Sequence, residues 1–178
     1  MKKLLLIVLF LIVGCSQKSE QSNAIDSKAS TLTIDRILSK PSITGTSPSS
    51  PLWSSDSQKL AFLWSNSGSP RREIWIVDGD GSGLRQITSD NEGTGGVNMF
   101  AWTSNNKELI YLRSGDLWHI SYLNGEEKRL TNTGGNKSNL ALSPDGRYAS
   151  FLKDGDLWIF NLKTGKLTQE TKVGVPSI

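Results

Sequence analysis

The sequence predicts an all-β fold built from three copies of a unit of about 40 residues, each with four short antiparallel strands. The most uniform strand is the third of each unit, at residues 74–77, 117–120 and 157–160. Its central tryptophans keep a regular spacing, since Trp118 follows Trp75 by 43 positions and precedes Trp158 by 40. Four-stranded repeats of this period are typical of β-propeller blades, so we expect a partial propeller of about three blades.

Residues 1–14 are predicted to be a secretory leader and not part of the fold. Lys2 and Lys3 precede an apolar run at 4–13, which is too short to span a bilayer stably. The run ends in Gly14-Cys15 and resembles a bacterial lipobox, which implies lipidation of Cys15, the only cysteine in the chain. The alternative is an ordinary signal peptide or membrane anchor with an incidental thiol. The expected location is the bacterial cell envelope, anchored to the membrane through Cys15 and facing the periplasm, with the outer membrane preferred because Ser16 replaces the Asp of an inner-membrane retention signal.

Two segments separate the leader from the repeats. Residues 15–30 are rich in Ser, Lys, Gln and Asn and nearly lack large apolar side chains, so they are predicted to be a disordered tether. Residues 31–50 form a lead-in with one amphipathic stretch at 32–38 followed by Pro41 and Pro48. We expect this lead-in to pack on the first blade or to form a stray strand before it.

The three predicted blades cover residues 51–90, 91–133 and 134–178, the last with the start of a further segment. Turn-forming residues separate their first and second strands, and Asp56 and Asp145 are expected to cap those turns through local hydrogen bonds. The first unit inserts extra residues around 65–72, as a surface loop tolerates.

Alternation along the third strand places its tryptophan on one face and Ile76, His119 or Ile159 on the other. Because both faces are apolar, each blade is expected to pack between neighbours. Three blades would then leave two faces open. The expected blade-core residues are Trp53, Trp75, Trp102, Trp118, Trp158, Phe62 and Phe151.

The repeat, with Trp-Ser-x-Asp, Leu-Ala-Phe, Ile-Trp-Ile-Val-Asp and a closing Ile-Thr in the first unit, resembles two families. One is the TolB-like propeller of the Tol system, and the other is the N-terminal WD-like propeller of prolyl oligopeptidase-type serine peptidases. The lead-in at 32–38 and the segment 154–160 look like dipeptidyl peptidase IV-type enzymes, and this resemblance is preferred. It implies a catalytic α/β-hydrolase domain after the propeller, with a Ser nucleophile in G-x-S-x-G.

No catalytic residue is predicted within the chain itself. The stretch 79–83 (GDGSG) does not match G-x-S-x-G, and the only histidine, His119, occupies a strand position equivalent to Ile76. The acidic run that begins at Asp78 is expected to be a hairpin rather than a calcium loop, and no metal or cofactor is predicted. Trp64 and the loop at 93–96 could line a ligand surface, but nothing else in the sequence converges on them. Without residues 1–14 the formal net charge falls from +3 to +1, and no basic stripe predicts nucleic-acid binding.

The preferred interpretation is therefore the non-catalytic propeller portion of a lipid-anchored dipeptidyl peptidase IV-like enzyme, gating or positioning peptide for a hydrolase domain outside this chain. The alternative is a stand-alone TolB-like envelope lipoprotein that acts as a scaffold for protein or polysaccharide. The expected partners are the membrane and either a hydrolase domain or further blades, whereas the ligand is not identified by the sequence.

Overall fold

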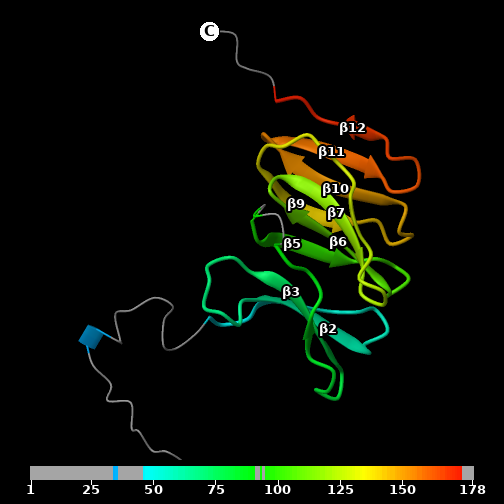
Figure 1. Ribbon diagram of the computed structural model, residues 1–178. Helices are drawn as coiled ribbons and strands as arrows, with labels where there is room; N and C mark the ends of the chain where they lie inside the picture. The colour runs from blue at the N-terminus through cyan, green and yellow to red at the C-terminus, as the bar shows by residue number, and fades with distance from the viewer. Residues whose placement is uncertain (1–33, 36–45, 91–92, 94, 174–178) are drawn as a thin grey trace, which may run out of the picture. The chain divides into compact units, whose positions relative to one another are not determined.

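A computed structural model describes residues 34–35, 46–90, 93 and 95–173 (Figure 1). Every described residue belongs to one compact unit, Ile34–Ile178. The predicted leader, Cys15 and the tether lie outside the described residues, as does most of the lead-in.

Twelve strands are assigned in the described part, and they form three separate four-stranded antiparallel sheets, each in chain order. The first sheet contains β1 (Ser49–Trp53), β2 (Lys59–Trp64), β3 (Glu73–Asp78) and β4 (Arg85–Gln86). The second contains β5 (Val97–Trp102), β6 (Glu108–Arg113), β7 (Asp116–Ser121) and β8 (Glu127–Arg129). The third contains β9 (Lys137–Leu142), β10 (Tyr148–Lys153), β11 (Asp156–Asn161) and β12 (Leu167–Gln169). The predicted three-blade, all-β architecture is confirmed.

The sheets pack face to face in sequence order, and two apolar clusters lie between them. The first interface joins the first two sheets and includes Ala61, Ile76 and Tyr111, which are almost completely buried. The second interface joins the second and third sheets around Leu112 and Phe151. Side chains alternate between the two faces of each strand, so the middle sheet contributes to both clusters.

The turns between first and second strands follow the expected chemistry. Asp56 accepts hydrogen bonds from the Ser54 hydroxyl at 2.6 Å and the Gln58 backbone N–H at 3.0 Å. Asp145 does the same with Ser143 and Arg147 in the third sheet. Hydrogen bonds from Ser143 and from the Arg147 backbone lower the pKa of Asp145 to about 2. These carboxylates serve the turns, as the sequence predicts.

The same arrangement of hydrogen bonds between an acid and a threonine recurs in each sheet, and we call it the acid–threonine clasp. A carboxylate at the start of the third strand accepts a hydrogen bond from the hydroxyl of a threonine that follows the fourth strand. The same hydroxyl accepts a hydrogen bond from the backbone N–H of the residue directly after the acid. The three pairs are Glu73–Thr88, Asp116–Thr131 and Asp156–Thr171. The clasp ties the outermost strand of each sheet to the start of the third.

Candidate binding groove between β1 and β5

The first strand of every sheet is an edge strand, and each carries an irregularity in its pairing with the second strand. Polar side chains lie at these irregular positions: Ser50 in β1, Asn98 in β5 and Asn139 in β9, all exposed. Ser50 and Asn139 both have a φ of 54°, which is uncommon for a residue other than glycine. A bulge re-aims side chains and interrupts pairing, so these edges present polar groups rather than a flat ladder.

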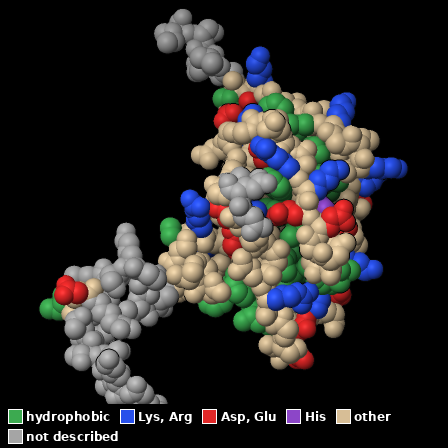
Figure 2. All heavy atoms as spheres, in the orientation of Figure 1, with side chains coloured by type: hydrophobic (Ala, Val, Ile, Leu, Met, Phe, Trp, Pro, Cys, Tyr) green, Lys and Arg blue, Asp and Glu red, His purple; other side chains and the backbone are tan. Residues whose placement is uncertain are grey.

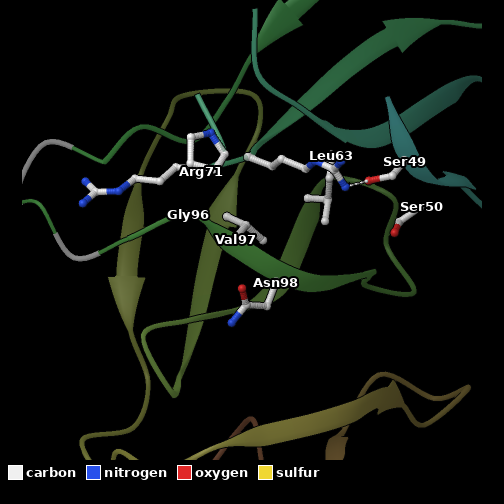
Figure 3. Close-up of a pocket in the computed structure, with 9 residues that line it drawn as sticks. Ser49, Ser50, Leu63, Arg71, Gly96, Val97 and Asn98 are labelled. Carbon is white, nitrogen blue, oxygen red and sulfur yellow. Dashed lines mark hydrogen bonds between the residues drawn. The ribbon is translucent and has the colours of Figure 1, made fainter. Parts of the chain in front are cut away.

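A groove runs between β1 and β5, and we call it the β1–β5 groove. Its first part is a hollow of about 460 Å³ bordered by Ser49, Leu63, Arg72 and Asn98 (Figure 3). Its second part, about 210 Å³, shares Ser50 and Asn98 with the first and is bordered by apolar residues, namely Pro51, Leu52, Met99 and Phe100. One end of the groove is therefore polar and the other apolar.

The loop inserted in the first repeat supplies one cation to the polar end. The Arg72 guanidinium donates to the Ser49 hydroxyl at 2.8 Å, drawn as a dashed line in Figure 3. The Arg71 side chain, which is 59% exposed, extends away from Ser49 and Asn98 in the same view and pairs with Asp90 at 2.9 Å. This end of the groove thus contains one cation, Arg72, held in place by a serine.

The inserted loop is fastened to the second sheet by its backbone. The Arg72 carbonyl accepts a hydrogen bond from the Val97 N–H at 2.7 Å. A side chain at Gly96 would place its Cβ 2.7 Å from the Arg72 nitrogen and 2.8 Å from its oxygen, so this close approach requires glycine. The insertion therefore forms one wall of the groove and keeps a fixed position against β5.

An edge strand with free backbone groups, beside amide and hydroxyl side chains, is suited to hydrogen bonding an extended chain. The apolar end adds space for a nonpolar side chain, and Arg72 favours a negative group at the other end. On the face shown in Figure 2, Lys and Arg are interspersed with Asp and Glu and do not form a continuous basic stripe.

The structure distributes the predicted blade-core residues between interfaces and outer faces. Phe151 is fully buried and Trp75 is 9% exposed, while Trp53 is 51% exposed on the outer side of the first sheet. The remaining four, Phe62, Trp102, Trp118 and Trp158, are half-buried.

The other candidates serve local structure. His119 is half-buried, and its Nε2 lies 3.3 Å from a Glu108 carboxylate oxygen. Asp78 and the glycines that follow form the turn between β3 and β4, in agreement with the predicted hairpin. Trp64 donates its indole N–H to the Thr46 carbonyl at 2.7 Å and packs edge-on against Trp75.

Sequence reasoning did not identify the groove, although it considered Gly96 as part of a ligand-lining loop. The signal that could have found it is the polar residues near the starts of the predicted first two blades, namely Ser50 at the end of the lead-in and Asn98 in the second blade. Among the described residues, no cluster of three or more His, Cys, Asp or Glu could hold a metal ion. The described part likewise contains no helix with the length and apolarity needed to cross a membrane.

Comparison with known proteins points to one fold. No family model matches the chain. A putative TolB from Agrobacterium tumefaciens matches with a TM-score of 0.57 and 19% identity, over 68% of this chain and 45% of that one. TolB from Acinetobacter baumannii matches with a TM-score of 0.60 and 22% identity, over 72% of this chain and 33% of that one. An oligogalacturonate lyase in complex with manganese gives a TM-score of 0.57 and 21% identity, over 70% of this chain and 36% of that one.

The chain thus spans between a third and a half of the length of these solved neighbours. At such identities the likeness establishes fold alone, and it does not distinguish the peptidase propellers from other TolB-like proteins. The three sheets have the fold of part of a TolB-like β-propeller.

Proposed function

We propose that this chain is a binding scaffold whose β1–β5 groove holds an extended peptide segment with an acidic group and an apolar side chain. The observation that carries the proposal is that two adjoining hollows share Ser50 and Asn98, with Arg72 at one end and Met99 and Phe100 at the other. A peptide lying along β1 or β5 would meet a strand edge that no other described strand pairs with, although the Leu52 carbonyl and the Val97 N–H already have partners. The acidic group would lie at the arginine end.

Fluorescence anisotropy with short labelled peptides tests this function. One set carries a single Glu and a single Leu at varied spacing, and a matched set replaces Glu by Lys. We expect the acidic set to bind and the basic set to bind at least several-fold more weakly, because like charges at an interface are repelled. Equal binding of both sets, or no binding by either, would contradict the proposal.

A matched pair of variants locates the site. Asn98→Asp adds a negative charge inside the groove, so the acidic peptides should bind about three- to tenfold more weakly. Asn139→Asp makes the same change at the exposed bulge of β9, away from the groove lining. The site is misplaced if the second variant weakens binding as much as the first.

A second candidate function is the propeller portion of a dipeptidyl peptidase IV-like enzyme, in which the same groove would position substrate peptide. The resemblance of residues 32–38 and 154–160 to those enzymes favours it. The coding DNA beyond Ile178 decides between the candidates. Further repeats followed by G-x-S-x-G would support the peptidase, and a stop codon followed by unrelated genes would rule it out.

We also propose that Cys15 carries the lipid that holds the scaffold in the bacterial envelope. The support is the lipobox-like sequence before the only cysteine. Metabolic labelling with a radioactive fatty acid should mark the protein and should fail in Cys15→Ser. Labelling that persists in this variant would exclude Cys15 as the attachment site.

A further inference from the structure

Among the described residues, the outer side of the first sheet has less cover than most equivalent positions in the other two sheets. We call it the first open face, and it contains Trp53, Leu60, Phe62 and Val77 together with Trp75, which is only 9% exposed. Tyr111 and Phe151, which occupy the position of Phe62 in their sheets, are fully buried, whereas Phe62 is only half-buried. Trp102, the equivalent of Trp53, packs against the first interface.

The outer side of the third sheet, which faces away from the second sheet, is also less buried than the equivalent positions of the other sheets. This second open face consists of Tyr148, Ser150, Leu152, Leu157 and Ile159. Leu157 and Ile159 are half-buried, but their equivalents Ile74 and Ile76 in the first sheet are fully buried by the second sheet. A hollow of about 360 Å³ lies on this face, bordered by Leu142, Tyr148, Ser150 and Ile159.

The two open faces are the two halves of the interface that already occurs twice within the chain. At each internal interface, the earlier sheet contributes the residues at the repeat positions of Ile74 and Ile76. The following sheet contributes the residues at the repeat positions of Phe62 and Trp75. The second open face carries residues at the repeat positions of Ile74 and Ile76. The first open face carries Phe62 and Trp75 themselves. No internal interface joins two faces of the same kind.

We propose that a second copy of this chain covers these faces head to tail, with the first open face of one copy on the second open face of the other. The Trp53 and Phe62 rings of one copy would pack over Ile159 and the hollow beside Ser150 of its partner. Two such contacts use all four open faces, so a pair that forms both contacts is closed and does not grow further. The inference rests on the fold and is independent of peptide binding in the groove.

Sedimentation equilibrium of the full chain, in detergent matched to the buffer density, measures the polypeptide mass. We expect twice the mass of one chain over a wide range of concentration. Trp53→Lys and Ile159→Lys each place a charge in one half of the contact, so each variant alone should sediment as a monomer. Leu123→Lys, at a position 64% exposed in the turn between β7 and β8, is the matched control and should remain a dimer.

Mixing the two variants distinguishes a head-to-tail contact from a contact between identical faces. Each variant keeps the half that the other has lost, so the mixture should form a one-to-one pair with a single intact contact. Circular dichroism of each variant reports its folding, and Trp53→Gln with Ile159→Thr replaces the lysine pair if either of those loses its sheet spectrum. A wild-type monomer, an association that the open-face variants leave unchanged, or a mixture that stays monomeric would each overturn the proposal.

Discussion

The two internal interfaces share the acid–threonine clasp but use different cations. At the first interface, Arg113 from the end of β6 donates to Glu73 at 2.6 Å, and its side chain is 3% exposed. At the second, Lys137 from the start of β9 has its Nζ 3.9 Å from an Asp116 carboxylate oxygen and donates to the carbonyls of Gly115 and Gly134. The repeat therefore preserves the acid and the threonine, while the basic group comes from a different strand at each interface.

The environment of the acid explains why the two cations are not equivalent. Glu73 has Arg113 and the Thr88 hydroxyl as its side-chain partners, so much of its charge compensation comes from the neighbouring sheet. Asp116 receives donors from Arg129 and Thr131 of its own sheet and from the Thr133 backbone. The first interface should consequently depend more strongly on its cation than the second.

The largest effect is expected for Arg113→Met. It leaves the Glu73 carboxylate buried without its cation, which costs about 3–5 kcal/mol when one partner of a buried pair is removed. Urea denaturation followed by tryptophan fluorescence measures the free energy of unfolding. A loss below about 1 kcal/mol would show that the pair contributes little to the first interface.

A smaller effect is expected for Lys137→Met. Burial lowers the pKa of Lys137, so its charge already carries a desolvation cost that methionine avoids. The variant loses hydrogen bonds to two carbonyls, while Asp116 keeps the donors of its own sheet, and a loss of about 1–2 kcal/mol follows. The same urea titration checks it, and a loss as large as that of Arg113→Met would contradict the difference between the interfaces.

The contribution of the clasp to stability can be compared between the second sheet, where the clasp is buried against the third sheet, and the third sheet, where it is exposed. Thr131→Val removes a buried hydroxyl that bonds both Asp116 and the Leu117 N–H, which should cost about 1–2 kcal/mol. Thr171→Val removes the same two bonds in the exposed clasp of the third sheet, where water replaces them, so we expect less than about 0.5 kcal/mol. Equal losses in thermal or urea unfolding would mean that the neighbouring sheet does not strengthen the clasp.

The pH dependence of stability gives the smallest expected effect. Burial raises the pKa of Asp116, but hydrogen bonds from Arg129, the Thr133 N–H and Thr131 outweigh it and hold the pKa below 3.8. The unfolded chain then binds more protons near this pH, so the stabilisation is present above pH 3.8 and is lost as pH falls through the lower folded-state pKa. The melting temperature of Asp116→Asn should therefore fall less steeply than that of the wild type below about pH 4. Parallel curves for the two proteins would contradict this assignment.

Much of the fold could be predicted because every sheet repeats the same local signals. Trp53, Trp102 and Leu142 end their first strands as expected, and the tryptophans of β3, β7 and β11 share a face with Val77, Ile120 and Phe160. Period-two alternation and turn residues determine these features locally.

The groove and the interface cations could not be predicted in the same way. Ser50 and Asn98 acquire their role from pairing irregularities, which depend on how the first strand meets the second and not on composition. Arg113 and Lys137 occupy different positions of the repeat, so aligning the units does not show that both approach the acid of the preceding sheet. These contacts depend on tertiary packing between sheets.

The sheets are joined in chain order by two interfaces that depend unequally on charge. Double-mutant cycles measure this inequality, with Glu73→Gln and Arg113→Met at the first interface and Asp116→Asn and Lys137→Met at the second. From urea unfolding of all the single and double variants, we predict a coupling free energy of about 2–3 kcal/mol at the first interface and below about 1 kcal/mol at the second. Absence of coupling between Glu73 and Arg113, or a stronger coupling between Asp116 and Lys137, would contradict the account.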